Sequence, residues 1–141
     1  MTRLVVVGGS AAGMATAARA KRFNRELEVV VFEKTGYVSY APCGIPYYIE
    51  GLIESLEKLT YYTVEYFRKE RGIDVHVKHE VKEVDVSAKK VYVEDLETGR
   101  SFEMEYDYLM LATGGKPVIP PVEGVDLEGV YWIRSLSLIH I

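Results

Sequence analysis

The first 33 residues constrain the fold of this chain more than any other part. Arg3 to Val7 is a short apolar, β-branched run without alternation, which is typical of a strand buried on both faces of a parallel sheet. A glycine-containing turn follows, and then Met14 to Asn24, which is rich in alanine and predicts a helix. Glu28 to Phe32 predicts a second buried strand, and Glu33 ends it. This order predicts a βαβ unit in an α/β fold.

The turn before the predicted helix has the spacing of a dinucleotide-binding site. Gly8 permits a tight turn out of the strand, and Gly13 allows the helix to pack closely on the sheet. Small side chains between them let a pyrophosphate approach the N–H groups of the helix N-terminus; they are Ser10, Ala11 and Ala12. Glu33 follows Gly13 by 20 residues, as a carboxylate that binds ribose hydroxyls would. The pattern predicts dinucleotide binding, although Ser10 stands where the motif has its middle glycine.

The only cysteine, Cys43, lies ten residues after Glu33, where a helix is expected to begin. Pro46 fits the first turn of a helix that runs to about Glu50, because a proline there loses no helical hydrogen bond. A helix N-terminus favours the reactive thiolate, and Gly44 leaves room beside it for a planar ring. Cys43 is therefore a candidate redox thiol, and the alternative is a small buried hydrophobic residue.

The remaining chain predicts one more helix, two strands and an antiparallel meander. Thr60 or Thr63 is the expected cap of the helix. The expected elements are a helix over 64–70 ended by Gly72, a strand over 73–78, three meander strands between 81 and 104, and a buried strand over 106–111.

Two side-chain clusters in this part are expected to be structural. The aromatic cluster consists of Tyr61, Tyr62, Tyr66 and Phe67, and we expect it to pack rather than to stack on bases. His76 and His79 have no cysteine or carboxylate set at ligand spacing, so no metal site is expected.

Composition narrows the partners and the compartment. A chain of 141 residues fits one domain, and a net charge of −4 argues against nucleic acid as the main partner. One cysteine excludes an intrachain disulfide framework and favours a reducing, cytoplasmic setting. The first residues lack the layout of a signal peptide, and no apolar run approaches the ~20 residues that span a bilayer, so no membrane partner is expected.

These motifs resemble the N-terminal, FAD-binding part of the coenzyme A-disulfide reductases, NADH oxidases and NADH peroxidases. That group forms the single-cysteine branch of the pyridine nucleotide–disulfide oxidoreductases. The resemblance covers residues 1–135 and rests on the segments 7–14, 32–34, 39–48, 70–73 and 111–117. It implies a Rossmann-like FAD-binding domain with a parallel sheet, a βαβ unit and a three-stranded antiparallel meander. It also implies FAD as cofactor and NAD(P)H as electron donor.

The resemblance assigns roles to individual residues. Cys43 is the implied catalytic residue, and Tyr48 stands where the paired-cysteine branch has its second cysteine. The implied FAD contacts are Gly8, Ser10, Ala11, Ala12, Gly13, Glu33, Lys34, Val81, Ala112, Thr113 and Gly114. The implied coenzyme A contacts are Arg19, Arg22, Ser39 and Arg71. Three of these four are cationic, which suits a ligand with several phosphates; the alternative for the arginines is a solvated helix face.

The implied reaction passes electrons from NAD(P)H through FAD to Cys43 and to a coenzyme A disulfide. Cys43 then alternates between a thiolate and a mixed disulfide, or a sulfenic acid. Pro42 stands where bacterial members commonly have Asn. Oxygen, peroxide and sulfur stay open as terminal acceptors.

The chain also departs from the family in length. The NAD(P)H-binding and dimerisation domains, which make the full-length relatives homodimers, have no counterpart in these 141 residues, and residues 136–141 form an apolar tail unlike the family. We therefore expect a truncated or altered chain. Two alternatives follow: a non-catalytic module that binds FAD, coenzyme A or another adenine nucleotide, and an NAD-binding Rossmann domain with a structural cysteine.

Overall fold

The computed structural model describes residues 1–134, which fall into two compact units. Unit 1 consists of Met1–Tyr40 and Thr60–Thr113, and unit 2 consists of Ala41–Leu59 and, among the described residues, 114–134. The apolar tail expected over 136–141 lies outside the described residues. Among residues 1–134, no helix has the length and apolar character that crossing a bilayer requires.

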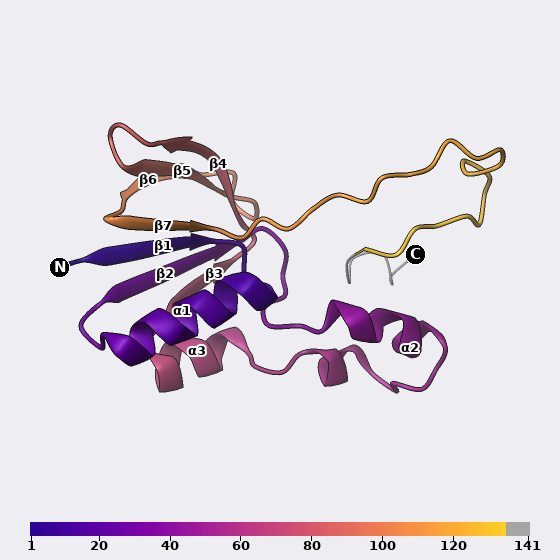
Figure 1. Ribbon diagram of the computed structural model, residues 1–141, viewed down its shortest axis with the longest axis horizontal. Helices are drawn as coiled ribbons and strands as arrows, with labels where there is room; N and C mark the ends of the chain where they lie inside the picture. The colour runs from indigo at the N-terminus through magenta and orange to yellow at the C-terminus, as the bar shows by residue number, and fades with distance from the viewer. Residues whose placement is uncertain (135–141) are drawn as a thin grey trace. The chain divides into compact units, whose positions relative to one another are not determined.

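A four-stranded parallel sheet is the centre of unit 1 (Figure 1). Its strands, in the order β3-β2-β1-β7, are β3 (Asp74–Val77), β2 (Glu28–Glu33), β1 (Arg3–Val7) and β7 (Tyr108–Leu111). Helix α1 (Ala11–Phe23) connects β1 to β2, which pair in parallel, so the predicted βαβ unit is confirmed. Helix α3 (Val64–Arg71) precedes β3.

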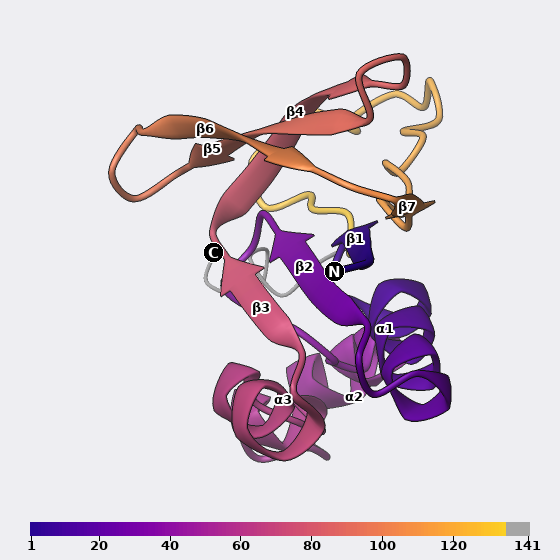
Figure 2. The same ribbon diagram turned by 90° about the vertical axis from the view of Figure 1, so that its left-hand side faces the viewer.

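The predicted meander is the second sheet of unit 1. It consists of β4 (His79–Asp85), β5 (Lys90–Asp95) and β6 (Ser101–Glu105), paired antiparallel in chain order. Figures 1 and 2 show α1 and α3 on one face of the parallel sheet and the meander on the other. The predicted α/β fold class, with a parallel sheet and an antiparallel meander, is confirmed.

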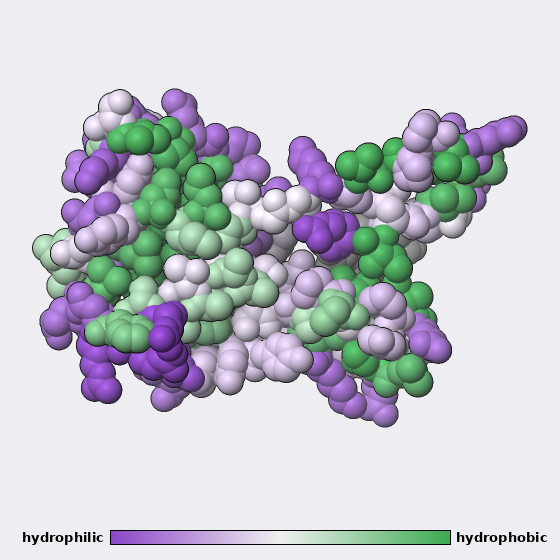
Figure 3. Space-filling model, in the orientation of Figure 1, coloured by the Kyte–Doolittle hydropathy of each residue, from purple (hydrophilic) through white to green (hydrophobic). Residues whose placement is uncertain are grey.

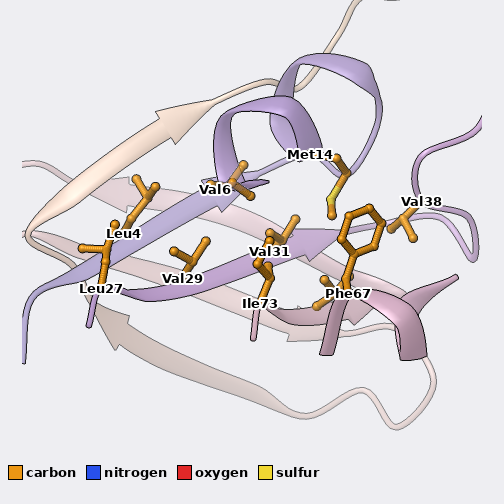
Figure 4. Packing of buried hydrophobic residues seen from close by; sticks show 11 residues of the cluster. Leu4, Val6, Met14, Leu27, Val29, Val31, Val38, Phe67 and Ile73 are labelled. Carbon is orange, nitrogen blue, oxygen red and sulfur yellow. The ribbon is translucent and has the colours of Figure 1, made fainter. Parts of the chain in front are cut away.

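Both faces of the parallel sheet are buried, which explains the apolar runs without alternation. Leu4 and Val6 of β1 face the helices and pack with Met14 and Phe67 (Figure 4). Val5 and Val7 face the opposite way and join the meander residues in a second cluster, which includes Phe32. Alternate residues of one strand therefore support two separate cores.

Two expectations about element boundaries and burial were wrong. Helix α1 begins at Ala11 rather than Met14, because Ala11 and Ala12 are good helix formers and extend it to the glycine turn. The last strand, expected to be buried, is exposed at Tyr108 (63%) and Leu111 (58%). It is an edge strand with β1 as its neighbour in the sheet.

The start of helix α3, its end at Gly72 and the start of the short helix of unit 2 are as their sequences predict. The Thr63 hydroxyl accepts a hydrogen bond from the Tyr66 N–H (3.2 Å), and Gly72 ends α3 in the left-handed conformation. In unit 2, α2 (Ile45–Ile49) has Pro46 in its first turn. The 3₁₀ turns of this unit are Pro42–Gly44 and Leu56–Leu59.

We predict that Gly13→Ala destabilises the protein although it adds a better helix former. A Cβ at Gly13 would lie 1.8 Å from the Gly8 carbonyl oxygen, a backbone atom that cannot move aside. The steric cost of about 3 kcal/mol exceeds the ~1 kcal/mol gained in helix propensity. Urea unfolding followed by circular dichroism should show a free energy of unfolding that is lower by about 2 kcal/mol.

The matched control is Gly36→Ala, where the nearest atom to the new Cβ is the flexible Lys78 Cε at 3.8 Å. This variant should unfold at nearly the same urea concentration as the wild type. Equal stability of the two variants would contradict the packing role of Gly13.

Candidate functional site

The glycine turn is held by backbone contacts that leave no space for side chains. Gly8 has a positive φ of 106°, and a Cβ there would lie 2.2 Å from the Ala112 carbonyl oxygen. A Cβ at Gly13 would lie 1.8 Å from the Gly8 carbonyl oxygen. The end of β1, the start of α1 and the end of β7 therefore meet at one point, at the carboxyl edge of the parallel sheet, where open α/β sheets bind ligands.

Glu33 fixes the same turn from the end of β2. Its side chain is 8% exposed, and its Oε2 accepts a hydrogen bond from the Gly9 N–H (2.6 Å). Its Oε1 accepts a second bond from the Thr35 N–H (2.8 Å). Each carboxylate oxygen keeps a further lone pair. The carboxylate is thus rigidly positioned, and its predicted contact with ribose hydroxyls stays a prediction.

The first turn of α1 is suited to a phosphate group. Ala11 and Ala12 are exposed, this turn carries no acidic residue, and the Ser10 side chain makes no capping hydrogen bond. The first N–H groups of a helix have no partner within the helix, and its dipole favours an anion there. The residues predicted to hold the FAD pyrophosphate therefore fit that group in size and charge.

The other predicted FAD contacts are spread over several elements. Lys34 is exposed directly after Glu33, and Val81 lies in β4, packed on the cluster that contains Phe32. Ala112 joins the glycine turn, and its N–H donates to the Val7 carbonyl (2.8 Å). Thr113 ends unit 1, whereas Gly114 belongs to unit 2.

A groove of about 930 Å³ lies between α1 and α3 in unit 1. All four residues predicted to bind coenzyme A line it; they are Arg19, Arg22, Ser39 and Arg71. The floor along α1 is formed by small residues, among them Ala11 and Ala15. The structure brings together residues that are up to 52 positions apart in the chain (71 − 19). Their role in binding stays a prediction.

The groove is cationic although the chain is acidic overall. Its lining includes three arginines and no carboxylate, and no ion pair joins Arg19, Arg22 or Arg71 to an acid within residues 1–134. Strongly hydrophilic side chains gather near the C-terminal ends of α1 and α3 (Figure 3). Uncompensated cations in a concave site attract anionic ligands.

Two of these arginines are held by aromatic neighbours. The Arg19 guanidinium carbon lies 4.3 Å from the centroid of the Phe23 ring. Arg71 Nε donates a hydrogen bond to the Tyr66 hydroxyl (3.0 Å). These contacts hold both side chains without neutralising their charges, so both guanidinium groups stay available to an anion.

Ser39 enters the groove from a strained backbone. Its φ of 53° lies in the left-handed region that favours glycine. Its N–H donates to the Gly9 carbonyl (2.9 Å), and its carbonyl accepts from the Tyr61 N–H (3.2 Å). These two bonds hold the loop between the glycine turn and the segment that leads into α3.

Cys43 lies in the 3₁₀ turn of unit 2, one residue before the N-cap of α2, and is exposed. Its place before a helix is as predicted, but α2 has five residues and sums few peptide dipoles. The expectation that Gly44 leaves open space was wrong. Gly44 is buried, and a Cβ there would lie 2.4 Å from Leu59 Cδ2, so the missing side chain makes room for Leu59.

The aromatic residues at the groove are the part of the site that sequence reasoning missed. Tyr62, Tyr66 and Phe67 line the groove as well as packing together. Their only sequence signal is their closeness to the cap Thr63, which does not indicate on which side of α3 they lie. Among residues 1–134 there is no group of metal-binding side chains; His76 Nε2 lies 2.8 Å from Asp74 Oδ2.

Comparison with known proteins finds relatives that match almost the whole of this chain. The NADH oxidase of Methanocaldococcus jannaschii is 42% identical over 135 residues, which cover 96% of this chain and 30% of that protein. The NAD(P)H coenzyme A polysulfide/persulfide reductase of Pyrococcus horikoshii is 50% identical over 129 residues, covering 92% and 28%. The chain thus spans about 30% of the length of these relatives.

Structural comparison leads to the same group. The NAD-dependent persulfide reductase from A. fulgidus superposes with a TM-score of 0.88 at 38% identity, over 96% of this chain and 25% of that one. The fold is that of the FAD-binding domain of flavoprotein reductases. The family model of the pyridine nucleotide-disulphide oxidoreductases matches residues 2–137. The chain therefore belongs to the pyridine nucleotide-disulphide oxidoreductase family.

Proposed function

We propose that this chain carries the FAD site, the redox cysteine and the coenzyme A site of a flavin-dependent reductase of coenzyme A disulfide. The observation that carries the proposal is the cationic groove, which gathers Arg19, Arg22, Ser39 and Arg71 on one surface. Relatives from Pyrococcus abyssi and Pyrococcus furiosus, 51% and 50% identical, are named NAD(P)H sulfur oxidoreductase (CoA-dependent). The family uses FAD and NAD(P)H, and these are the cofactor and electron donor proposed here.

The FAD site of the proposal is the glycine turn. Ala11 and Ala12 offer N–H groups to the pyrophosphate, and Glu33 offers its remaining lone pairs to the ribose. Bound FAD would supply two-electron redox chemistry, while the protein supplies binding and orientation.

The reaction proposed for this chain's own residues is thiol–disulfide exchange at Cys43. The Cys43 thiolate attacks one sulfur of coenzyme A disulfide, a Cys43–coenzyme A disulfide forms, and the first coenzyme A leaves as a thiolate. Two electrons and a proton, provided in the end by NAD(P)H, release the second coenzyme A and restore the Cys43 thiolate. Cys43 is exposed, as an attacking thiol must be.

The arginines of the groove would hold the substrate through its phosphates. Guanidinium groups form short, charge-assisted hydrogen bonds to phosphate oxygens. Three arginines that form no ion pair within residues 1–134 line one groove, and they match the several phosphates of coenzyme A better than a small disulfide without phosphate. This is the reason for preferring coenzyme A disulfide as substrate over small disulfides without phosphate.

The names of the relatives favour a second candidate acceptor. The Pyrococcus horikoshii protein is named for polysulfide and persulfide, and the Methanocaldococcus jannaschii protein for NADH oxidation. In that alternative, coenzyme A in the groove is a bound thiol carrier. The Cys43 thiolate attacks the inner sulfur of a persulfide, forming a mixed disulfide and releasing hydrosulfide, or it is oxidised by hydrogen peroxide to a sulfenic acid with release of hydroxide. A non-catalytic nucleotide-binding module is the remaining alternative. It would bind the same ligands without thiol exchange.

We predict that the purified chain binds FAD in preference to NAD⁺. Adding the chain to a fixed concentration of FAD should quench the flavin fluorescence, because a bound flavin stacks on protein groups. A thousandfold excess of NAD⁺ is the control and should not displace the flavin. Displacement by NAD⁺ at similar concentrations would instead support an NAD-binding domain with a structural cysteine.

We predict that Arg22→Gln and Arg71→Gln each weaken coenzyme A binding roughly five- to tenfold. Each variant removes a charged hydrogen bond to phosphate, which contributes about 1–1.4 kcal/mol at an exposed site. Isothermal titration calorimetry measures the change. The control is Arg25→Gln, because Arg25 is exposed next to α1 but does not line the groove. Equal weakening by all three variants would show a general charge effect and contradict the groove as the site.

We predict that coenzyme A disulfide modifies the chain once, at Cys43. Intact-mass spectrometry should show the addition of one coenzyme A and the release of one equivalent of thiol, since the chain has one cysteine. Cys43→Ser should bind coenzyme A with unchanged affinity and form no adduct. Modification by glutathione disulfide at the same rate would contradict recognition through the groove.

A further inference from the structure

We propose that the ring of Tyr62 is a stacking surface for a purine base, so that the groove selects adenine nucleotides and not only phosphates. The inference rests on the proposed function, because it names the part of the ligand that the groove recognises. Tyr62 lines the groove together with Arg71, and 45% of its surface is exposed. The sequence alone had indicated packing for this residue.

The ring of Tyr62 is fixed before any ligand arrives. It lies parallel to the Tyr66 ring, with centroids 4.5 Å apart and an interplanar angle of 15°. Phe67 meets both rings edge-on, at 5.8 Å and 5.7 Å. Phe67 is 4% exposed and belongs to the core beneath α3. A stack anchored to the core loses little conformational freedom when a base lies on it.

The charges nearest to the stack suit the phosphates of the same ligand. Arg71 Nε donates a hydrogen bond to the Tyr66 hydroxyl, and its guanidinium carbon lies 5.4 Å from the centroid of the Tyr66 ring, beside the aromatic pair. A nucleotide has its phosphates within a few bonds of its base, so a ring beside an arginine matches that arrangement. Guanidinium and aromatic surfaces together are the usual partners of unpaired bases.

A purely structural role for Tyr62 is the main competing explanation. Tyr62 stands directly before the cap Thr63, and Phe67 is the fourth residue of α3, so their contact has the positions of a hydrophobic staple. A staple needs an apolar side chain but no aromatic face. Leucine at position 62 would keep the staple and remove the ring, which separates the two roles.

The test is calorimetric titration of the whole chain with each half of coenzyme A. The two probes are adenosine 3′,5′-bisphosphate and 4′-phosphopantetheine. Excess FAD is present in each titration to occupy the glycine turn. Tyr62→Leu should weaken binding of the adenosine bisphosphate about tenfold, the usual loss when one base stack is removed. It should leave phosphopantetheine binding unchanged. Tyr62→Phe, which keeps the ring, should bind both probes like the wild type.

The matched control is Tyr61→Ala. Tyr61 is 73% exposed and does not line the groove, and its hydrogen bond to Ser39 is made by the backbone N–H. This variant should bind both probes like the wild type. Circular dichroism of Tyr62→Leu verifies that α3 is intact.

Each result separates this inference from the proposed function. Unchanged binding of the adenosine bisphosphate by Tyr62→Leu overturns the stacking role and leaves the coenzyme A site in place. Weakened phosphopantetheine binding with unchanged nucleotide binding also overturns it, because the ring would then contact the pantetheine end. Failure of the wild type to bind coenzyme A or either half overturns both proposals.

Discussion

The close contact between the backbones of Gly8 and Gly13 is the constraint on which the site in unit 1 depends. It brings the first turn of α1 against the end of β1, at a distance that only two residues without side chains allow. The N-terminus of α1 is thereby aimed at the carboxyl edge of the sheet. The same contact fixes the direction of the whole helix, and thus the position of the groove that its other face forms with α3.

Helix α1 is suited to anions in two different ways along its length. Its first turn offers unpartnered N–H groups and the positive end of the dipole, without any cationic side chain. Its later turns offer the guanidinium groups of Arg19 and Arg22. A helix of 13 residues is about 20 Å long, so two phosphate-containing ligands can lie on one helix without repelling each other at close range.

The fold was predictable from sequence because its determinants are local. Apolar runs such as Val5–Val7, the glycine spacing and the cap at Thr63 each act within a few residues. The groove was less accessible to sequence reasoning, since Arg22 and Arg71 meet only through the packing of α1 beside α3. The four groove residues came from family resemblance rather than from spacing. Tyr62, Tyr66 and Phe67 pack together as predicted. Their place on the groove was not predictable, because an aromatic cluster before a helix has the same pattern whether it faces the core or a ligand.

Gly44 shows a second limit of sequence reasoning. A glycine beside a cysteine indicates that a side chain is not tolerated, but it does not indicate which neighbour excludes it. In unit 2 that neighbour is Leu59, the last residue of the segment Ala41–Leu59 to which Gly44 also belongs. At Gly8 and Gly13 the missing side chain instead allows a backbone carbonyl to approach closely. Three glycines of one chain are therefore required for two different reasons.

The hydrogen bonds around Ser39 have a consequence for how this protein can diversify. They form a continuous path from the Glu33 carboxylate through Gly9 to Ser39 and Tyr61. Because Ser39 lines the groove, the path connects the glycine turn to the groove. A change of this loop's backbone that suits a new ligand would also disturb the glycine turn. New specificities in such a scaffold are therefore expected to arise from side chains on α1 and α3, while the loop between the two sites stays fixed.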